Sequence, residues 1–200
     1  KTLTVRAIIN SIKTIKPHAK FKLAAPTGRA SQRLSEVTME PANTIHKLLN
    51  INSYQMVDLN PEKPSNMNDL DYLIIDEFSM VDNILLSKLL DASNNISQIV
   101  IVGDDDQLPS VGPGNVLKDL IDSDLINVIR LNKVYRQKEI SNIITLAHHI
   151  KNDEDVSEDF DNDVTFYETS NSEIKTKLLE YIKLVIKKGY DPNDIQVIAP

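Results

Sequence analysis

The sequence predicts an α/β fold in which helices flank a parallel β-sheet. Two continuous apolar runs, Tyr72–Ile75 and Ile99–Val102, lack the polar alternation of a half-exposed strand. Such runs are typical of parallel strands buried on both faces, although a short apolar run alone could also belong to a helix. Segments with helical spacing of apolar residues stand between the predicted strands, as a parallel sheet with flanking helices requires.

The elements are predicted in chain order from apolar spacing and from proline, glycine and capping signals. They are a helix from Thr4 to Pro17, a strand Phe21–Ala25, helices from Arg29 to about Val37 and over Thr44–Leu49, an insertion Asn50–Asn68, the strand Tyr72–Ile75, a helix Val81–Leu90, the strand Ile99–Val102, a helix from Asn115 to about Ile121, a strand Val128–Leu131, a helix from Glu139 to Ile150, a strand Val164–Tyr167, a helix Ser172–Lys188 and a strand Ile195–Ala199.

The composition bounds the class of protein. Of 200 residues, 41% are hydrophobic and 26% are charged, which is typical of a soluble globular protein with a sizeable core. No apolar run approaches the length of a membrane span, and no signal-peptide pattern opens the chain. The absence of cysteine excludes disulfides and thiolate metal sites and fits a reducing compartment. We therefore expect a cytoplasmic protein with no membrane partner.

The net charge of -7 is unevenly distributed along the chain. Residues 1–40 hold eight Lys or Arg against two Glu, an excess of six positive charges. Residues 153–163 hold seven acidic residues and no basic one, and this block is predicted to be a solvated linker. The negative net charge therefore does not exclude a nucleic-acid partner.

Two carboxylates follow the central predicted strand. Asp76 and Glu77 come directly after Ile75, at the carboxyl end of the strand, where open α/β sheets bind their ligands. This is a Walker B arrangement, in which the first carboxylate holds Mg²⁺ and the second orients and deprotonates an attacking water. A solvated strand end is the commoner interpretation of an isolated Asp-Glu pair, but other motifs accompany this one.

Two further segments suit phosphate. Lys1-Thr2 precedes the first predicted helix as the end of a G-x-x-x-x-G-K-[ST] phosphate loop would, although Lys-Thr pairs are common and the glycines of that loop are absent. The turn Pro26-Thr27-Gly28 exposes backbone N–H groups at the start of a helix. The same turn could be an ordinary strand–helix joint capped by Thr27.

Together these motifs resemble the first motor domain of superfamily 1 DNA helicases, and most closely the RecD-like enzymes, which include the alpha subunit of exodeoxyribonuclease V. The similar segments are Lys1-Thr2 (motif I), Ala25–Ser31 (motif Ia), Thr44–Leu49, Ile75–Met80 (motif II), Val102–Gly112 (motif III) and Tyr135–Gln137 (motif IV). The Pro-Thr-Gly-Arg-Ala and Gly-Asp-x-x-Gln-Leu-Pro motifs are the specific ones.

The resemblance implies a RecA-like P-loop NTPase fold and a division of the chain into three parts. Residues 1–150 would form the first motor domain, which binds ATP and single-stranded DNA. Residues 151–163 would form the acidic linker, and residues 164–200 the beginning of a second α/β motor domain. The phosphate-loop glycines and motifs V and VI are missing, so we expect a fragment at both ends that is inactive alone.

The resemblance also implies roles for individual residues. The nucleotide and metal contacts would be Lys1 to the β- and γ-phosphates of ATP, Thr2 and Asp76 to Mg²⁺, and Tyr135 to the base or, equally, within the core. The catalytic residues would be Glu77 as general base, Gln107 as sensor of the γ-phosphate and Arg136 as arginine finger. The contacts to the backbone of one DNA strand would be Pro26, Thr27, Arg29 and His46.

The implied function is ATP-driven translocation on single-stranded DNA, 5′ to 3′, with unwinding of duplex ends in repair and recombination. No nuclease signature appears, so other exodeoxyribonuclease V-type subunits would supply any nuclease. Two alternatives stay open: a related superfamily 1 motor, such as a relaxase-linked or phage helicase, and a nucleotide-regulated DNA-binding scaffold with little turnover.

Overall fold

The computed structural model of the chain describes residues 2–51, 67, 69–131, 142–156 and 163–198. It forms two compact units, one from Lys1 to Leu131 and one from Asn132 to Pro200. The predicted domain division at residue 150 derives from motifs and composition, and it stays a prediction.

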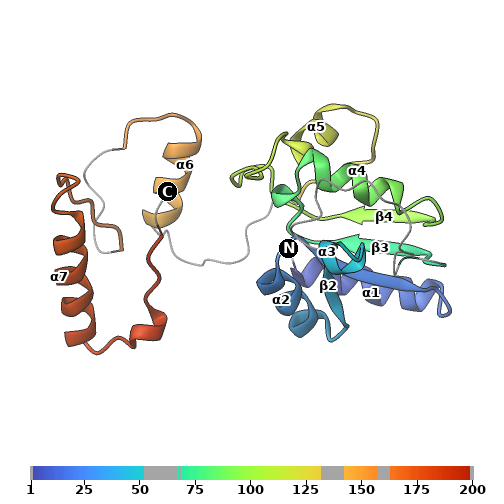
Figure 1. Cartoon of the computed structure of the whole chain (residues 1–200), viewed down its shortest axis with the longest axis horizontal. Coiled ribbons are helices and arrows are strands. Elements are labelled where there is room, and N and C mark those ends of the chain that lie inside the picture. Colours follow the sequence, from blue (N-terminus) through green and yellow to red (C-terminus); the bar gives the residue numbers. More distant parts are fainter. Residues whose placement is uncertain (1, 52–66, 68, 132–141, 157–162, 199–200) are drawn as a thin grey trace. The chain divides into compact units, whose positions relative to one another are not determined.

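A four-stranded parallel sheet lies at the centre of the first unit, in the order β2-β1-β3-β4 (Figure 1). The strands are β1 (Phe21–Ala25), β2 (Ala42–Thr44), β3 (Tyr72–Ile75) and β4 (Gln98–Ile101). The predicted central strand is confirmed as β3, which pairs with β1 on one side and with β4 on the other. The predicted α/β fold with a parallel sheet flanked by helices is therefore confirmed.

Helices cover both faces of this sheet (Figure 1). One face carries α1 (Thr2–Ile15) and α2 (Gly28–Thr38), and the other carries α3 (Ile45–Leu48), the 3₁₀ turn η2 (Phe78–Met80), α4 (Asn83–Asp91) and α5 (Val116–Asp122). Side chains of a strand alternate between faces. Accordingly Ile74 packs with Val5 and Ile9 of α1, while Leu73 and Ile75 join the cluster on the opposite face.

Three details of the first unit differ from the sequence prediction. The strand predicted to be buried on both faces, β4, is only half-buried, because it pairs with β3 alone in the described sheet. β2 was not predicted, since three residues are too few to show a pattern. The predicted helix Val81–Leu90 is observed as α4, which begins at Asn83 and is buried along the stripe formed by Leu85 and Leu89, while Ile84 and Leu90 are 43% and 51% exposed.

The strand predicted over Val128–Leu131 does not form. These residues have no regular structure and are exposed, with Ile129 at 88%. A strand gains its backbone hydrogen bonds from a neighbouring strand, and no described strand pairs with this segment. Residues 128–131 therefore have the residue pattern of a strand, but no described strand lies beside them to form the backbone hydrogen bonds.

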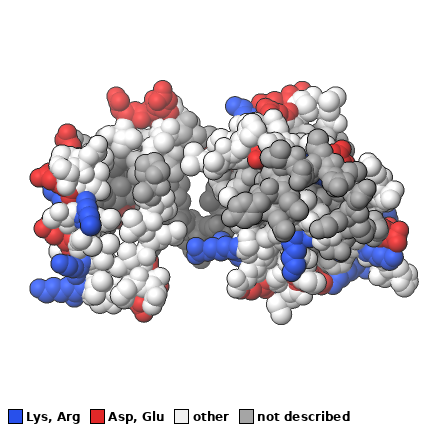
Figure 2. Space-filling model, viewed as in Figure 1, with Lys and Arg blue, Asp and Glu red and all other residues white. Residues whose placement is uncertain are grey.

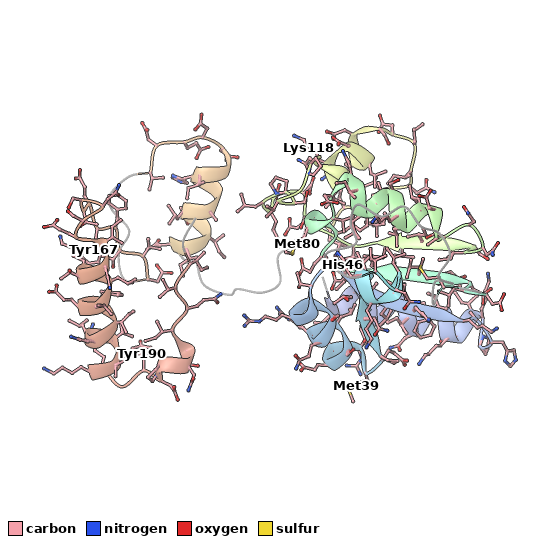
Figure 3. The ribbon with its side chains drawn as sticks, viewed as in Figure 1. Met39, His46, Met80, Lys118, Tyr167 and Tyr190 are labelled. Atoms are coloured by element: carbon pink, nitrogen blue, oxygen red, sulfur yellow. The ribbon has the colours of Figure 1, made fainter. Side chains whose placement is uncertain are left out.

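The described residues of the second unit form α6 (Asn142–Lys151), α7 (Ile174–Lys187) and the 3₁₀ turn η3 (Pro192–Asp194). The helix predicted over Ser172–Lys188 is confirmed, and the helix predicted from Glu139 to Ile150 is confirmed from Asn142 on, residues 139–141 lying outside the described ones. The predicted strands Val164–Tyr167 and Ile195–Ala199 are irregular over residues 164–167 and 195–198, and Ala199 lies outside the described residues. The reason is again the lack of a paired neighbour within the described part of the unit. The Tyr167 ring meets the Tyr181 ring of α7 edge to face, with 5.9 Å between centroids (Figure 3 labels Tyr167).

Among the residues that the structure describes, every helix is too short or too polar to span a membrane.

Candidate functional site

The carboxyl ends of the strands bring separate sequence motifs to one edge of the sheet. β1 leads into Pro26, β2 into α3, β3 into Asp76 and β4 into Val102 and Gly103. The register aligns these ends, because Ala24 lies opposite Ile75, and Ile75 lies opposite Ile101. Since a short turn joins α1 to β1, α1 runs antiparallel to the strand and begins, at Thr2, toward this same edge.

Asp76 is buried at the end of β3, with only 3% of its surface exposed. Its N–H donates to the carbonyl oxygen of Ala24 at 3.0 Å, and its Oδ1 accepts from the N–H of Glu77 at 2.9 Å. Glu77 is half-buried and adopts the left-handed conformation, with φ 55° and ψ 41°. Few non-glycine residues adopt positive φ. The chain therefore turns sharply between the two carboxylates and enters η2 at once.

Backbone hydrogen bonds join this turn to the end of β4. The N–H of Val102 donates to Ile75 at 2.8 Å, and the N–H of Phe78 donates back to Val102 at 3.0 Å. Gly103 follows, and a Cβ atom there would lie 2.6 Å from Cδ2 of Leu117 and 3.5 Å from Cβ of Phe78. Only glycine allows this close approach without a shift. The predicted motifs II and III are thus held against each other.

A magnesium ion fits the donor chemistry of this edge. In nucleotide sites Mg²⁺ takes one or two protein carboxylates together with phosphate oxygens and waters, and it needs no cage of protein ligands. Asp76 supplies a buried carboxylate, and the described residues hold no group of three acidic or histidine side chains around a common point. Thr2, the other predicted ligand, is the first residue of α1, and its side chain lies outside the description.

Gln107 lies in the loop after β4 and is exposed. Its side-chain amide donates to Oδ2 of Asp104 at 3.3 Å, and its backbone N–H donates to the carbonyl oxygen of Asp104 at 3.2 Å. Asp104 directly follows Gly103, so the loop that holds Gln107 starts at the end of β4, which is bonded to the turn that follows Asp76 and Glu77. The role of Gln107 as sensor of the γ-phosphate stays a prediction.

An ion pair joins the loop that holds Gln107 to the segment that precedes residue 132. The Arg130 guanidinium donates to Oδ2 of Asp105 at 2.8 Å. This hydrogen bond and the charge of Asp105 raise the pKa of Arg130. Sequence reasoning did not single out Arg130, because an isolated arginine in an apolar run carries no motif.

The four residues predicted to contact DNA come from two neighbouring strand ends. Pro26, Thr27 and Arg29 follow β1, and His46 lies on α3, which follows the adjacent β2 (Figure 3). Thr27 has a structural role as well, since its Oγ1 accepts from the N–H of Ala30 at 3.2 Å and caps α2. Arg29 is exposed in the first turn of that helix, and Pro26 and His46 are half-buried.

The basic side chains do not form one continuous patch on the face drawn in Figure 2. Lysine and arginine side chains of the sheet-containing unit are scattered there among acidic and uncharged ones. A DNA contact on this face would therefore depend on a few placed residues rather than on a broad basic surface.

Three predicted site residues lie outside the described residues: Lys1, Tyr135 and Arg136. Their roles stay predictions.

A contact that sequence reasoning missed joins the start of α4 to the loop 110–114. Asp82 caps α4, with its Oδ1 accepting from the N–H of Leu85 at 2.7 Å. A Cβ atom at Gly112 would overlap Oδ2 of Asp82 and lie 2.7 Å from its Cγ. The N–H of Asn83 donates to Pro113 at 3.0 Å. An aspartate before a helical apolar pattern is a capping signal, but no sequence pattern indicates its contact with a glycine in a distant loop.

An open pocket of about 330 Å³ lies elsewhere, at the amino ends of the strands. It is lined by Lys16, Pro17, His18, Ala19 and Asp71. Because β1 and β3 begin beside it, this pocket is at the opposite edge of the sheet from Asp76 and Glu77.

A family model described as AAA domain matches residues 1–113, more than half of the chain. The chain belongs to the AAA domain family. This AAA domain is 30% identical to the RecBCD enzyme subunit RecD of Buchnera aphidicola over 239 aligned residues, which cover 92% of this chain and 39% of RecD. It is 36% identical to the ATP-dependent RecD2 DNA helicase of Deinococcus radiodurans over 148 residues, which cover 74% of this chain and 20% of RecD2. The chain thus spans less than half the length of these relatives.

Solved Pif1 helicases share the fold of this AAA domain. A Pif1 structure described for DNA unwinding at forked duplex DNA is 25% identical, with a TM-score of 0.54, and the match covers 79% of this chain and 43% of the other. Bacteroides Pif1 bound to single-stranded DNA is 22% identical, with a TM-score of 0.53 over 96% of this chain and 51% of the other, which is evidence for the fold alone. The predicted resemblance is confirmed: this is a superfamily 1 helicase motor domain related to RecD and Pif1.

Proposed function

We propose that the full-length protein carrying this AAA domain hydrolyses ATP, moves along single-stranded DNA and unwinds duplex ends. One observation carries the proposal. The carboxylate pair Asp76-Glu77 leaves the central strand and is joined by the Phe78–Val102 hydrogen bond to the loop that holds Gln107. A binding module has no need of a second carboxylate placed beside the metal-binding one, whereas hydrolysis needs a general base.

Each part of the chemistry has a residue of suitable type. Asp76 would hold Mg²⁺, which when bound would neutralise charge on the phosphate oxygens. Glu77 accepts a proton from the attacking water, and Gln107 hydrogen-bonds the γ-phosphate. We retain Lys1 and Thr2 for the phosphates and the metal, Tyr135 for the base and Arg136 for charge on the transferred group, as the RecD-like resemblance implies.

The DNA partner would lie along the ends of β1 and β2. Arg29, exposed there, is suited to a backbone phosphate, and Pro26, Thr27 and His46 lie on the same two strand ends. Contacts with phosphates bind any sequence and weaken as salt concentration rises. We therefore propose sequence-independent binding of single-stranded DNA.

We extend the proposal to 5′ to 3′ movement and to a role in DNA repair and recombination. The similarity to RecD and to RecD2 supports this extension. RecD is by name a subunit of the RecBCD enzyme, so other exodeoxyribonuclease V-type subunits are candidate partners of the full-length protein.

Strand displacement by the full-length gene product tests the proposal. ATP hydrolysis is measured with and without single-stranded DNA, and unwinding is measured on duplexes with either a 5′ or a 3′ single-stranded tail. We expect DNA-stimulated hydrolysis and displacement from the 5′ tail. Displacement only from the 3′ tail would contradict the direction, and ATP binding without DNA-stimulated turnover would contradict the motor.

A further inference from the structure

Half of the basic residues near the start of the sequence lie away from the proposed active site. Residues 13–22 contain four of the eight Lys and Arg of residues 1–40 and no acidic residue; the four are Lys13, Lys16, Lys20 and Lys22. This stretch runs from the end of α1 into β1, at the edge of the sheet where β1 and β3 begin (Figure 1). The proposed ATP hydrolysis and the proposed DNA contacts use none of these four lysines.

The open pocket of about 330 Å³ described above lies at this edge, and we call it the amino-edge pocket. The exposed Lys16 and His18 and the half-buried Asp71 contribute its polar groups. The five residues of β1 separate this edge from the edge that carries Asp76, which is roughly 15 Å at about 3.3 Å per residue. A ligand in the amino-edge pocket would therefore not compete with ATP.

Lys16 is held in place beside this pocket. Its ammonium lies 5.4 Å from the centre of the Tyr72 ring, and one helical turn earlier the Lys13 ammonium lies 5.6 Å from the centre of the Phe21 ring. Phe21 and Tyr72 are direct neighbours in the sheet. Lys13 is also paired with Glu40, which neutralises its charge. A lysine held by an aromatic ring keeps its charge and loses less conformational freedom when it binds an anion.

Hydrogen bonds between Asp71 and Lys20 fix another part of the pocket. Oδ2 of Asp71 accepts from the N–H of Lys20 at 2.8 Å, and the N–H of Asp71 donates to the carbonyl oxygen of Lys20 at 2.8 Å. The Asp71 carboxylate thus serves a backbone donor at the start of the sheet. Lys16 and Lys20 against Asp71 leave an excess of one positive charge, to which His18 adds when it is protonated. This balance favours an anionic ligand.

We propose that the amino-edge pocket binds the phosphodiester backbone of DNA through Lys16 and Lys20, as a second DNA contact separate from that of Arg29. Lysine ammonium groups bind phosphate oxygens as point charges and carry no sequence information. This inference rests on the proposed function, since it assumes that the protein acts on DNA.

DNA is favoured over other anions because the protein would already hold it. A DNA fork bound at the ends of β1 and β2 keeps its remaining arms at a high effective concentration near the rest of the domain. Two lysines that would bind a free anion only weakly can then strengthen the hold on the fork. An acidic protein segment would need an attachment of its own to gain the same advantage.

Chemical acetylation of lysines in the full-length protein, followed by mass spectrometry, tests the contact directly. The DNA probes are a short single strand, a duplex with one 5′ tail, and a fork with two single-stranded arms. We expect the fork to protect Lys16 and Lys20 and the short single strand to leave them reactive. Protection by the tailed duplex as well identifies duplex DNA as the source of the phosphates, and protection by the fork alone identifies the displaced strand. The control is Lys118, an exposed lysine of α5 (Figure 3), which should react equally with every probe.

Substitutions in the full-length protein test the role of the charge. Lys16→Gln with Lys20→Gln removes both charges and keeps most of the side-chain length. The slope of log affinity for the fork against log salt should fall by about 1.8 for two duplex contacts, or about 1.4 for two single-strand contacts. Lys16→Arg with Lys20→Arg keeps both charges and should keep the slope, which separates a lost contact from a change in fold. Lys118→Gln should also keep the wild-type slope.

Two results would overturn the inference: equal acetylation of Lys16 and Lys20 with and without the fork, and an unchanged salt slope in the Gln variant. Equal protection by polyglutamate would assign the pocket to an acidic protein segment and would overturn it as well. A wild-type protein that binds no DNA would contradict the proposed function itself. DNA-stimulated ATPase with both lysines unprotected would contradict this inference alone.

Discussion

The backbone N–H of Phe78 donates a hydrogen bond of 3.0 Å to the carbonyl oxygen of Val102. Phe78 is fully buried and follows Glu77 directly, while Val102 follows β4 and leads into the loop of Gln107. The bond therefore holds the turn after Glu77 and the end of β4, from which the loop of Gln107 starts, in one frame. Side-chain substitutions at Glu77 and Gln107 should change their chemistry without moving that frame.

Replacement of Glu77 by Gln should leave ATP binding intact and abolish most hydrolysis. The amide has the shape of the carboxylate but cannot accept a proton, and general-base contributions are typically about 10²–10⁴ in rate. Steady-state ATPase of the full-length protein at saturating single-stranded DNA measures the loss, and binding of a fluorescent ATP analogue is the control. Wild-type turnover in this variant would remove Glu77 from the mechanism.

Replacement of Gln107 by Ala should lower DNA-stimulated ATPase and unwinding together. Among the described residues, the side chain hydrogen-bonds only Asp104 of the same exposed loop, so its loss should leave the fold and nucleotide-free DNA binding nearly unchanged. Anisotropy titrations without nucleotide provide the control. A variant that lost DNA affinity alone would identify Gln107 as a DNA contact and not as a sensor of the γ-phosphate.

Binding of single-stranded DNA should weaken with salt and depend little on sequence. Arg29→Ala should reduce affinity for all oligonucleotides alike and lower the slope of log affinity against log salt by about one phosphate contact, or roughly 0.7 for a single strand. Anisotropy with oligonucleotides of different composition at several salt concentrations measures both quantities. A strong sequence preference that salt does not change would contradict a contact with the DNA backbone.

Gly103→Ala should destabilise the sheet-containing unit. The added methyl group would lie 2.6 Å from Leu117 in the core beside Phe78, and overpacking of this kind typically costs about 1–3 kcal/mol. Gly28→Ala is the matched substitution, because a Cβ atom there meets nothing within 4 Å. Urea unfolding of both variants measures the difference, and equal midpoints would show that Leu117 moves aside at no cost.

The sequence predicted most of the fold that carries the site. The uniform apolar run before Asp76 identified β3. A strand buried on both faces is apolar at consecutive positions, so its pattern can be read from the local sequence alone. The contact of Asp82 with Gly112 left no such pattern, since it depends on how far a loop folds back onto a helix. Residues 128–131 show the opposite case: their local pattern is that of a strand, but a strand also needs a partner.

The left-handed backbone conformation of Glu77 lowers folding stability at a position whose side chain the proposed hydrolysis requires. Asparagine tolerates positive φ better than glutamate does, so Glu77→Asn should relieve strain while removing the general base. We expect this variant to lose most ATP hydrolysis, by about 10²–10⁴ in rate, and to melt at a higher temperature than wild type, measured by thermal unfolding. A protein selected only for folding stability would not keep glutamate at this position. An inactive, more stable variant of this kind would also be a suitable form in which to trap the full-length protein with ATP and DNA bound together.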